Sequence, residues 1–242
     1  MCTVTVVPYG GGFRVMCNRD ERRTRPAALP PRIQRVGTRV AAFPLDPLGG
    51  GTWIGVNDAG LVLTLLNRQR VLPSVRRIAR PRSRGFLVRM LLDQGSSAAA
   101  VQALSRFDVT EFDPFSLVAI DASHVRVANS DGVDLGFANA PLAAPMLFTS
   151  SSLGDALVEA PRQRLFERMV VRQRRGWLEA QARFHRHQWR ARPEISVRMA
   201  RVDALTVSET VVDVSAEGHR LAYESLLPGA RWQRRRRCYF FR

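Results

Sequence analysis

The sequence predicts a layered α+β fold. Three observations support this prediction: β-branched and apolar runs near both ends of the chain, two hairpins marked by turn residues, and helical patterns that come in blocks between the strands. Helices that alternated singly with strands would instead indicate a parallel α/β sheet. With 242 residues, 45% of them hydrophobic, the chain is expected to form one domain over residues 1–242 without an internal repeat.

The first hairpin is predicted at the start of the chain. Thr3–Val7 is β-branched throughout, Gly10–Gly12 supplies a turn, and Phe13–Cys17 forms the returning strand. A short extended segment follows at Val40–Phe43 and is closed by Pro44. These residues predict strands for the first part of the chain.

The second hairpin is predicted between Thr52–Val56 and Leu61–Leu66. The stretch Asn57–Gly60 carries turn residues and separates two apolar runs. Neither run alternates polar with apolar residues, so both faces of this hairpin are expected to be buried.

Helical spacing of apolar residues begins after this hairpin. Ser83–Asp93 carries its apolar residues on one stripe, and Ser97–Phe107 follows a capping residue at Ser96. The later elements are predicted from the same patterns. They are a helix over Arg162–Phe184 with a break at Gly176, and strands at Ser116–Asp121, His124–Ala128, Met146–Thr149, Ser196–Met199, Thr206–Val214 and Arg220–Glu224.

Residues 228–242 form a basic and aromatic C-terminal tail. Within it, Arg234–Arg237 precedes Cys238, a tyrosine and two phenylalanines. We expect a loose, solvated end whose contact with acidic membranes is weak.

The net charge of +16 comes entirely from arginine. All 37 basic residues are arginines, and the chain contains no lysine. Nucleic-acid binders usually use both residues, since both neutralise phosphate. We therefore attribute the charge to a compositional bias and expect no specific nucleic-acid partner, although non-specific adhesion to polyanions follows from the charge itself.

Cysteine usage points to a reducing compartment. Cys2, Cys17 and Cys238 form no CxxC pair, so neither a disulfide framework nor a metal site is expected. The start of the chain lacks the basic and apolar regions of a secretory signal. No apolar run approaches the roughly 20 residues of a membrane span. The chain is expected to be cytoplasmic, with free thiols.

Cys2 is the residue with the most distinctive chemistry. Removal of Met1 would give Cys2 a free α-amine, whose pKa in model peptides is about 7.7–8.0. Such an amine can act as the general base for the thiol of its own residue. Taken alone, however, Cys2 is better explained as a small residue at position two.

The surroundings of Cys2 resemble the N-terminal-nucleophile hydrolases. In their bile salt hydrolase and penicillin V acylase branch the chain begins MCT, and the second strand ends in R-N-x-D. Asn18 and Asp20 match that ending, and the resemblance implies that Asp20 holds the α-amine. Cys17 stands where the hydrolases have arginine. Arg19 shares a strand face with Cys17 and is expected to point into the site, whereas Cys17 is expected to be a small core residue.

Two further segments extend this resemblance. Residues 55–67 are similar to a G-x-N-x-x-G-L run that ends in L-N, and the last Asn of that run donates to the oxyanion. Asn67 occupies this position; its alternative role is to satisfy a turn at a strand end. In FTSSSLGD, Ser150 stands where related acyltransferases carry Asn. Arg162 or Arg164 would then be the arginine that follows, and all three are candidate substrate-binding residues.

The whole chain most resembles the NRDE family, which includes the transport and Golgi organization protein 2 group. The blocks MCTVTVVP, CNRDERRTR, GGTWIGVN, TSSSLGD and SVRMARVDALTVSET run in order from Met1 to about Thr210. The resemblance implies the N-terminal-nucleophile fold, a four-layer αββα sandwich of two antiparallel sheets between helical layers. It also connects the chain with Golgi organisation, haem trafficking and lipid or acyl-CoA handling.

Two hypotheses about function follow. The first is a cysteine hydrolase that cleaves an amide or thioester bond of a small molecule with Cys2 as nucleophile and needs no cofactor. The second is a protein that binds or transports haem or an acyl lipid without turnover. His185 and His187 do not share a helix face and are expected to be solvated. His124 and His219 lie at strand starts and are expected to be structural.

Overall fold

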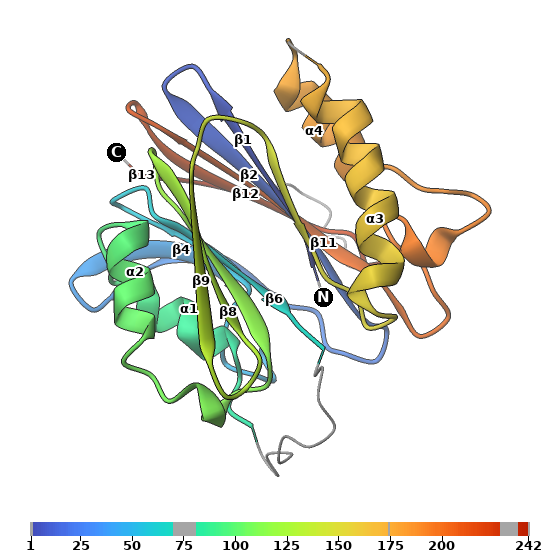
Figure 1. Ribbon diagram of the computed structural model, residues 1–242. Coiled ribbons are helices and arrows are strands. Elements are labelled where there is room, and N and C mark those ends of the chain that lie inside the picture. Colours follow the sequence, from blue (N-terminus) through green and yellow to red (C-terminus); the bar gives the residue numbers. More distant parts are fainter. Residues whose placement is uncertain (1, 70–80, 174, 228–236, 242) are drawn as a thin grey trace.

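Two antiparallel β-sheets stack face to face, and a layer of helices covers the outer face of each sheet (Figure 1). The computed structural model describes residues 2–69, 81–173, 175–227 and 237–241. The predicted α+β class and the four-layer αββα architecture are confirmed. Within these residues, no helix has the length and apolar character needed to cross a membrane.

The first sheet is built around the N-terminal hairpin. Gly10 and Gly11 have φ angles of 30° and 82°, where glycine is favoured, so the chain reverses here and pairs Tyr9 with Gly12. Four further strands complete the sheet in the order β10-β1-β2-β11-β12-β13. Their bounds are β1 Cys2–Tyr9, β2 Gly12–Arg22, β10 Met146–Thr149, β11 Ala204–Ser215, β12 Gly218–Ser225 and β13 Arg237–Phe241.

The second sheet contains the predicted central hairpin, whose turn is held by Asn57. The side-chain amide of Asn57 donates to the carbonyls of Leu92 and Gln94 at 2.9 and 2.7 Å, and its oxygen accepts from the amides of Ala59 and Leu61. The strands follow chain order: β3 Leu29–Val36, β4 Arg39–Leu45, β5 Ile54–Asn57, β6 Val62–Asn67, β7 Phe115–Ile120, β8 His124–Ser130 and β9 Leu135–Pro141.

Each helical layer buries an apolar stripe against one sheet. On the second sheet, Leu87 of α1 and Leu104 of α2 pack against Leu63 and Phe115. On the first sheet, Phe166 and Phe184 pack edge to face with ring centroids 5.2 Å apart. The helices are α1 Gly85–Leu91, α2 Ser97–Leu104, α3 Asp155–Phe166 with a π-helical continuation at Glu167–Val171, and α4 Trp177–His185; short 3₁₀ turns lie at Val109–Glu111 and Pro193–Ile195.

A third apolar layer fills the space between the sheets. Val4, Val6 and Val15 of the first sheet meet Ile54 and Val118 of the second, and all five are fully buried. Alternate residues of β1 and β2 therefore face this layer, while the residues between them face α3 and α4.

Most predicted elements are confirmed. Both hairpins form, Ser96 caps α2 by accepting from the amide of Ala99 at 3.1 Å, and Gly176 interrupts the third helical region. The sequence did not reveal β3 and β9. Both are edge strands of the second sheet and are mostly exposed, so neither carries a clear apolar pattern.

Three expectations are wrong. The predicted strand Ser196–Met199 is a bent segment without a strand ladder, because its backbone bonds to the carbonyls of Pro193 and His187 and to the side chains of Asn18 and Thr206. The helix expected from Arg162 begins at Asp155 and accommodates Pro161. The backbone of Arg237–Phe241 pairs with β12, so this part of the tail is not loose. The rest of the tail lies outside the described residues.

Candidate active site

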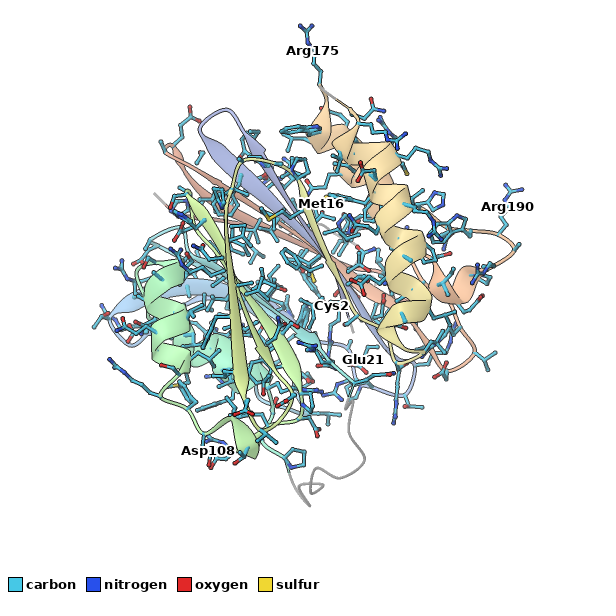
Figure 2. All side chains as sticks on the ribbon, in the orientation of Figure 1. Cys2, Met16, Glu21, Asp108, Arg175 and Arg190 are labelled. Carbon is cyan, nitrogen blue, oxygen red and sulfur yellow. The ribbon has the colours of Figure 1, made fainter. Side chains whose placement is uncertain are left out.

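Cys2 lies in the wall of a cavity of about 740 Å³ at the edge of the sheet stack. Figure 2 shows Cys2 in the interior and Glu21, which also lines the cavity, below it. Residues of β1 and β6 approach each other with Cα atoms within 8 Å. This crossing brings the start of β1 to the end of β6, where Asn67 lines the same cavity.

Ser150 holds the backbone of Cys2. The amide of Ser150 donates to the carbonyl of Cys2 at 3.1 Å, and the α-nitrogen of Cys2 lies 3.4 Å from the Ser150 hydroxyl oxygen. Both residues are buried, at 3% exposure. Ser150 also lines a second cavity of about 370 Å³, which Asn67 shares. Ser150 thus contacts the nitrogen that removal of Met1 would turn into an amine.

Cys17 lies beside the thiol of Cys2. Across the hairpin Cys2 pairs with Arg19 and Val4 with Cys17, so both cysteines face the space between the sheets. A hydrogen bond from the Cys17 thiol, helped by the charge of Arg19, lowers the pKa of Cys2 against the opposing effect of burial. The same bond, together with burial, raises the pKa of Cys17 well above its ordinary value. Cys2 is therefore the thiol that ionises first.

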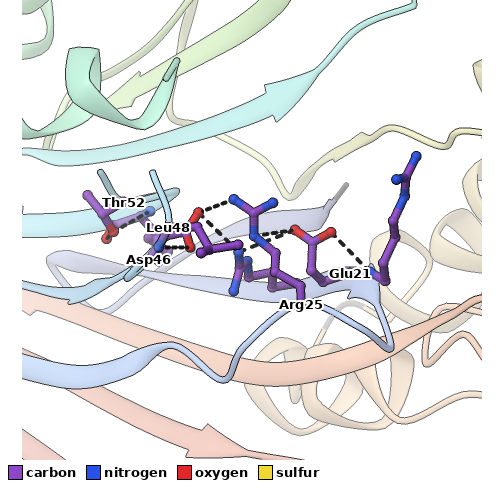
Figure 3. A network of polar contacts seen from close by, with 8 residues as sticks. Glu21, Arg25, Asp46, Leu48 and Thr52 are labelled. Atoms are coloured by element: carbon purple, nitrogen blue, oxygen red, sulfur yellow. Dashed lines mark hydrogen bonds and ion pairs between the residues drawn. The ribbon is translucent and has the colours of Figure 1, made fainter. Parts of the chain in front are cut away.

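Arg19 links Cys2 to a charged network at the cavity wall. Its guanidinium lies 4.1 Å from the centre of the Trp53 ring, and it pairs with Glu21 at 3.3 Å and Asp46 at 3.7 Å. Figure 3 shows Arg25 between Glu21 and Asp46, with ion pairs to both. Burial opposes ionisation of Asp46, but the hydrogen bond and charge of Arg25 hold its pKa below the ordinary value.

Arginines outnumber acids around this cavity. The described part of the cavity wall contains five arginines and three acidic residues. The wall therefore carries more basic than acidic side chains, and one of the arginines, Arg82, pairs with Glu111 at 2.6 Å. The arginines are Arg19, Arg22, Arg25, Arg82 and Arg84, and the acids are Glu21, Asp46 and Asp113.

Asp20 lies at the end of β1 that carries the α-nitrogen of Cys2. Asp20 is the residue after Arg19, which is the strand partner of Cys2. Its side chain is 2% exposed. The Thr206 hydroxyl donates to Asp20 at 2.6 Å. Burial raises the pKa of Asp20, while the charges of Arg162 and the amino terminus and the Thr206 hydrogen bond oppose that rise.

Asn18 faces away from the cavity, which corrects the expectation that it acts at the site. Alternation along β2 turns it toward α4, where its amide donates to the carbonyls of His185 and Val197 at 2.8 and 3.1 Å. Its oxygen accepts from the His185 ring at 3.0 Å, and Thr5 bonds to the other ring nitrogen at 2.7 Å. Asn18, which matches the hydrolase motif R-N-x-D, therefore holds α4 against the first sheet.

His185 is fully buried, so the expectation of a solvated side chain is wrong. Since Asn18 accepts at Nδ1, the ring carries its proton there and accepts from Thr5 at Nε2. Burial, reinforced by the nearby charge of Arg162, lowers the pKa of His185 to about 3.

The buried neutral state of His185 predicts a loss of stability in acid. The unfolded chain takes up the imidazole proton below about pH 6.5, whereas the folded protein takes it up only near pH 3. The free energy of unfolding should therefore fall by about 1.4 kcal/mol per pH unit across this interval. Burial of Asp20 opposes this trend, since its pKa is raised.

Urea unfolding curves recorded between pH 7 and pH 4 measure this slope. The His185→Gln variant should show a smaller slope than wild type, and the control His124→Gln, which leaves His185 in place, should keep the wild-type slope. A slope that is the same in wild type and His185→Gln would contradict the assignment.

Two predicted arginines lie away from Cys2. Arg162 is 1% exposed and donates to the hydroxyls of Thr3 and Thr149 and to the carbonyls of Ile195 and Ser196. Those bonds fix α3 to the first sheet, so Arg162 does not reach the cavity wall. Arg164 is exposed and lines a separate groove with Trp189. The structure supports neither as a residue that contacts a ligand beside Cys2.

The sequence assigned no role to Trp53 or Asp46, although both lie in the cavity wall. Trp53 belongs to the GGTWIGVN block, which contributed to the family resemblance. Its position under the Arg19 guanidinium, however, depends on how the two sheets pack. Asp46 follows β4 and gave no recognisable pattern.

Comparisons with known proteins agree with this geometry. The family model for Transport and Golgi organisation 2 matches residues 12–226. The N-acylethanolamine-hydrolyzing acid amidase ortholog of Caenorhabditis elegans superposes with a TM-score of 0.57 at 14% identity, covering 100% of both chains. An arginine-to-leucine variant of conjugated bile acid hydrolase from Clostridium perfringens gives 0.58 at 13%, covering 98% of this chain and 92% of that one.

A cysteine-to-alanine mutant of the same bile acid hydrolase gives a TM-score of 0.52 at 12% identity, covering 100% and 97% of the two chains. No curated protein sequence matches the chain. At these identities the superpositions establish the fold, which is that of the N-terminal-nucleophile hydrolases.

Proposed function

This chain belongs to the Transport and Golgi organisation 2 family and has the fold of the N-terminal-nucleophile hydrolases, and we propose that it is a cysteine hydrolase of an amide or thioester bond. The observation that carries this proposal is the position of Cys2. Its thiol lies in the wall of the cavity of about 740 Å³, while its α-nitrogen lies beside Ser150 and at the Asp20 end of β1.

We assign the base, the nucleophile and the oxyanion donor to Cys2 and Asn67. After removal of Met1, the neutral α-amine of Cys2 takes the thiol proton, and the thiolate attacks the substrate carbonyl. The side-chain amide of Asn67 donates to the oxygen that becomes negative. The ammonium then gives its proton to the leaving amine or thiol, which leaves an acyl thioester on Cys2. Water hydrolyses this thioester by the same proton path.

Neighbouring charges support each role. Asp20 orients the amine and stabilises the ammonium that forms after proton transfer, while Arg19 and Cys17 stabilise the thiolate. The excess of arginines around the cavity indicates a small-molecule substrate with an anionic group. The structural neighbours named above include an acid amidase and a conjugated bile acid hydrolase, which is consistent with amide cleavage.

A covalent intermediate on Cys2 tests this proposal. Protein without Met1 is incubated with a panel of acyl amides and acyl thioesters, each with an anionic and a neutral member, and quenched in acid. We expect peptide mapping to find the acyl group on Cys2, most readily with the anionic members. Cys2→Ala should lose turnover, and Cys238→Ala, which leaves the site intact, should retain it.

Two results would contradict the mechanism in which Cys2 is the nucleophile and its α-amine is the base. One is turnover by Cys2→Ala at the wild-type rate. The other is active material in which intact mass shows that Met1 is retained. Tight binding of a panel member without adduct or turnover would instead indicate a carrier.

A further inference from the structure

Cys17 is a buried thiol to which the hydrolytic mechanism gives no covalent step. Cys2 and Cys17 are diagonal neighbours on one face of the hairpin, because Cys2 pairs with Arg19 and Cys17 with Val4. Side chains in this relation have Cβ atoms within about 8 Å. Both side chains face the space between the sheets and belong to one buried cluster, and the two thiols are close enough to shift each other's pKa in opposite directions.

The two thiols differ in access. Cys2 is 3% exposed and lines the cavity, whereas Cys17 is 0% exposed and lies beneath it. A small oxidant in the cavity therefore reaches Cys2 first. Among the charges that act on the pKa of the Cys2 thiol, the amino terminus and Arg19 lower it and favour the reactive thiolate, while Asp20 raises it.

We propose that Cys17 is the resolving thiol for Cys2, so that hydrogen peroxide entering the cavity converts the pair into a reversible disulfide. Peroxide transfers one oxygen atom to the Cys2 thiolate, which becomes a sulfenic acid, and the other oxygen leaves as water after protonation. The Cys17 sulfur then attacks the Cys2 sulfur, and the sulfenic oxygen leaves as a second water. The two thiols lose two hydrogen atoms in all, and peroxide is reduced.

The position of Cys2 allows this bond to close. A disulfide needs the sulfur atoms to approach to about 2.05 Å, which requires the side chains to move together. Ser150 and β2 hold the backbone of Cys2 from both sides, so closure is a movement of the two side chains at the end of β1. Metal binding is a poorer use of the pair, since the described residues contain no group of three Cys, His, Asp or Glu suited to a metal.

The disulfide would protect the nucleophile. A sulfenic acid without a nearby thiol proceeds to sulfinic acid, which ordinary thiol reductants do not reverse. Resolution by Cys17 stops oxidation at a state that a dithiol reductant restores. The cavity therefore holds a thiol that can be switched off and recovered, whatever substrate it takes.

The chain lends itself to a direct test, because trypsin cleaves after Arg14 and Arg19 and places the two thiols on separate peptides, 2–14 and 15–19. Native protein is treated with hydrogen peroxide, free thiols are blocked, and the digest is analysed without reductant. We expect the two peptides to be linked to each other and released by dithiothreitol. Cys238→Ala should give the same link.

The variants Cys17→Ala and Cys17→Ser separate the resolving role from packing. Both should lose the link, and Cys2 should instead gain oxygen atoms that dithiothreitol does not remove. Circular dichroism identifies a variant that fails to fold, and the other variant then decides. The proposal is overturned if wild-type Cys2 gains oxygen without a link, if Cys238 forms the link, or if peroxide leaves Cys2 unmodified. None of these readouts requires hydrolase activity.

Discussion

One residue added ahead of Cys2 is expected to lower turnover by about 10²–10⁴-fold, the usual effect of losing a general base. The extension keeps the thiol but converts the α-amine into an amide, which cannot accept a proton. Ser150 can still contact that nitrogen, so the fold should not change. The measurement is kcat for the extended protein and for the same protein after proteolytic removal of the extra residue, which should recover full activity.

The pH dependence of the mature protein provides the companion measurement. Activity should rise with pH through the ionisation of the amine, near the ordinary value of about 7.7–8.0 as modified by its neighbours. Asp20 raises that value by favouring the ammonium, and nearby arginines lower it. The extended protein should lack this ionisation. Equal turnover by the extended and mature proteins would exclude the amine as base.

Replacement of Asn67 by alanine is expected to lower kcat by about 10²–10³-fold, as for an oxyanion donor removed from subtilisin. The comparison with subtilisin applies because both residues carry side-chain amides. Because the bond forms only as negative charge develops on the carbonyl oxygen, KM should change much less than kcat.

Asn129 offers a matched control for Asn67. It is an amide on the same sheet that lines the smaller cavity but not the cavity of Cys2. Asn129→Ala should therefore retain near wild-type kcat. If both variants lose kcat equally, or if Asn67→Ala changes only KM, Asn67 is not the oxyanion donor.

The relation between Cys2 and its neighbours could be predicted because hairpin register follows from a local turn. Two glycines between Tyr9 and Gly12 fix every pair in the hairpin, including Cys2 with Arg19. The strand period then assigns Cys17 and Arg19 to one face. The position of Asn67 was implied by the resemblance of residues 55–67 to the hydrolase run rather than by a turn, and the structure places this residue in the cavity wall.

Features that depend on packing between distant segments could not be predicted in this way. The helical pattern around His185 gave α4 but not the depth to which that side chain is buried. Asp46 and Trp53 reach Arg19 only because the loop before β5 lies against the end of β2, and no local spacing encodes that contact. Edge strands β3 and β9 lack an apolar face, so their sequences resemble loops.

The length of the Gly10–Gly11 turn determines which side chains of β2 lie beside Cys2. A shift of one residue in the pairing of β2 would exchange its two faces, placing Asn18 opposite Cys2 and turning Arg19 and Cys17 toward α4. The turn lies at the opposite end of the hairpin, seven residues or roughly 24 Å from Cys2. An insertion there would thus change the ionisation and redox behaviour of a thiol that it never touches.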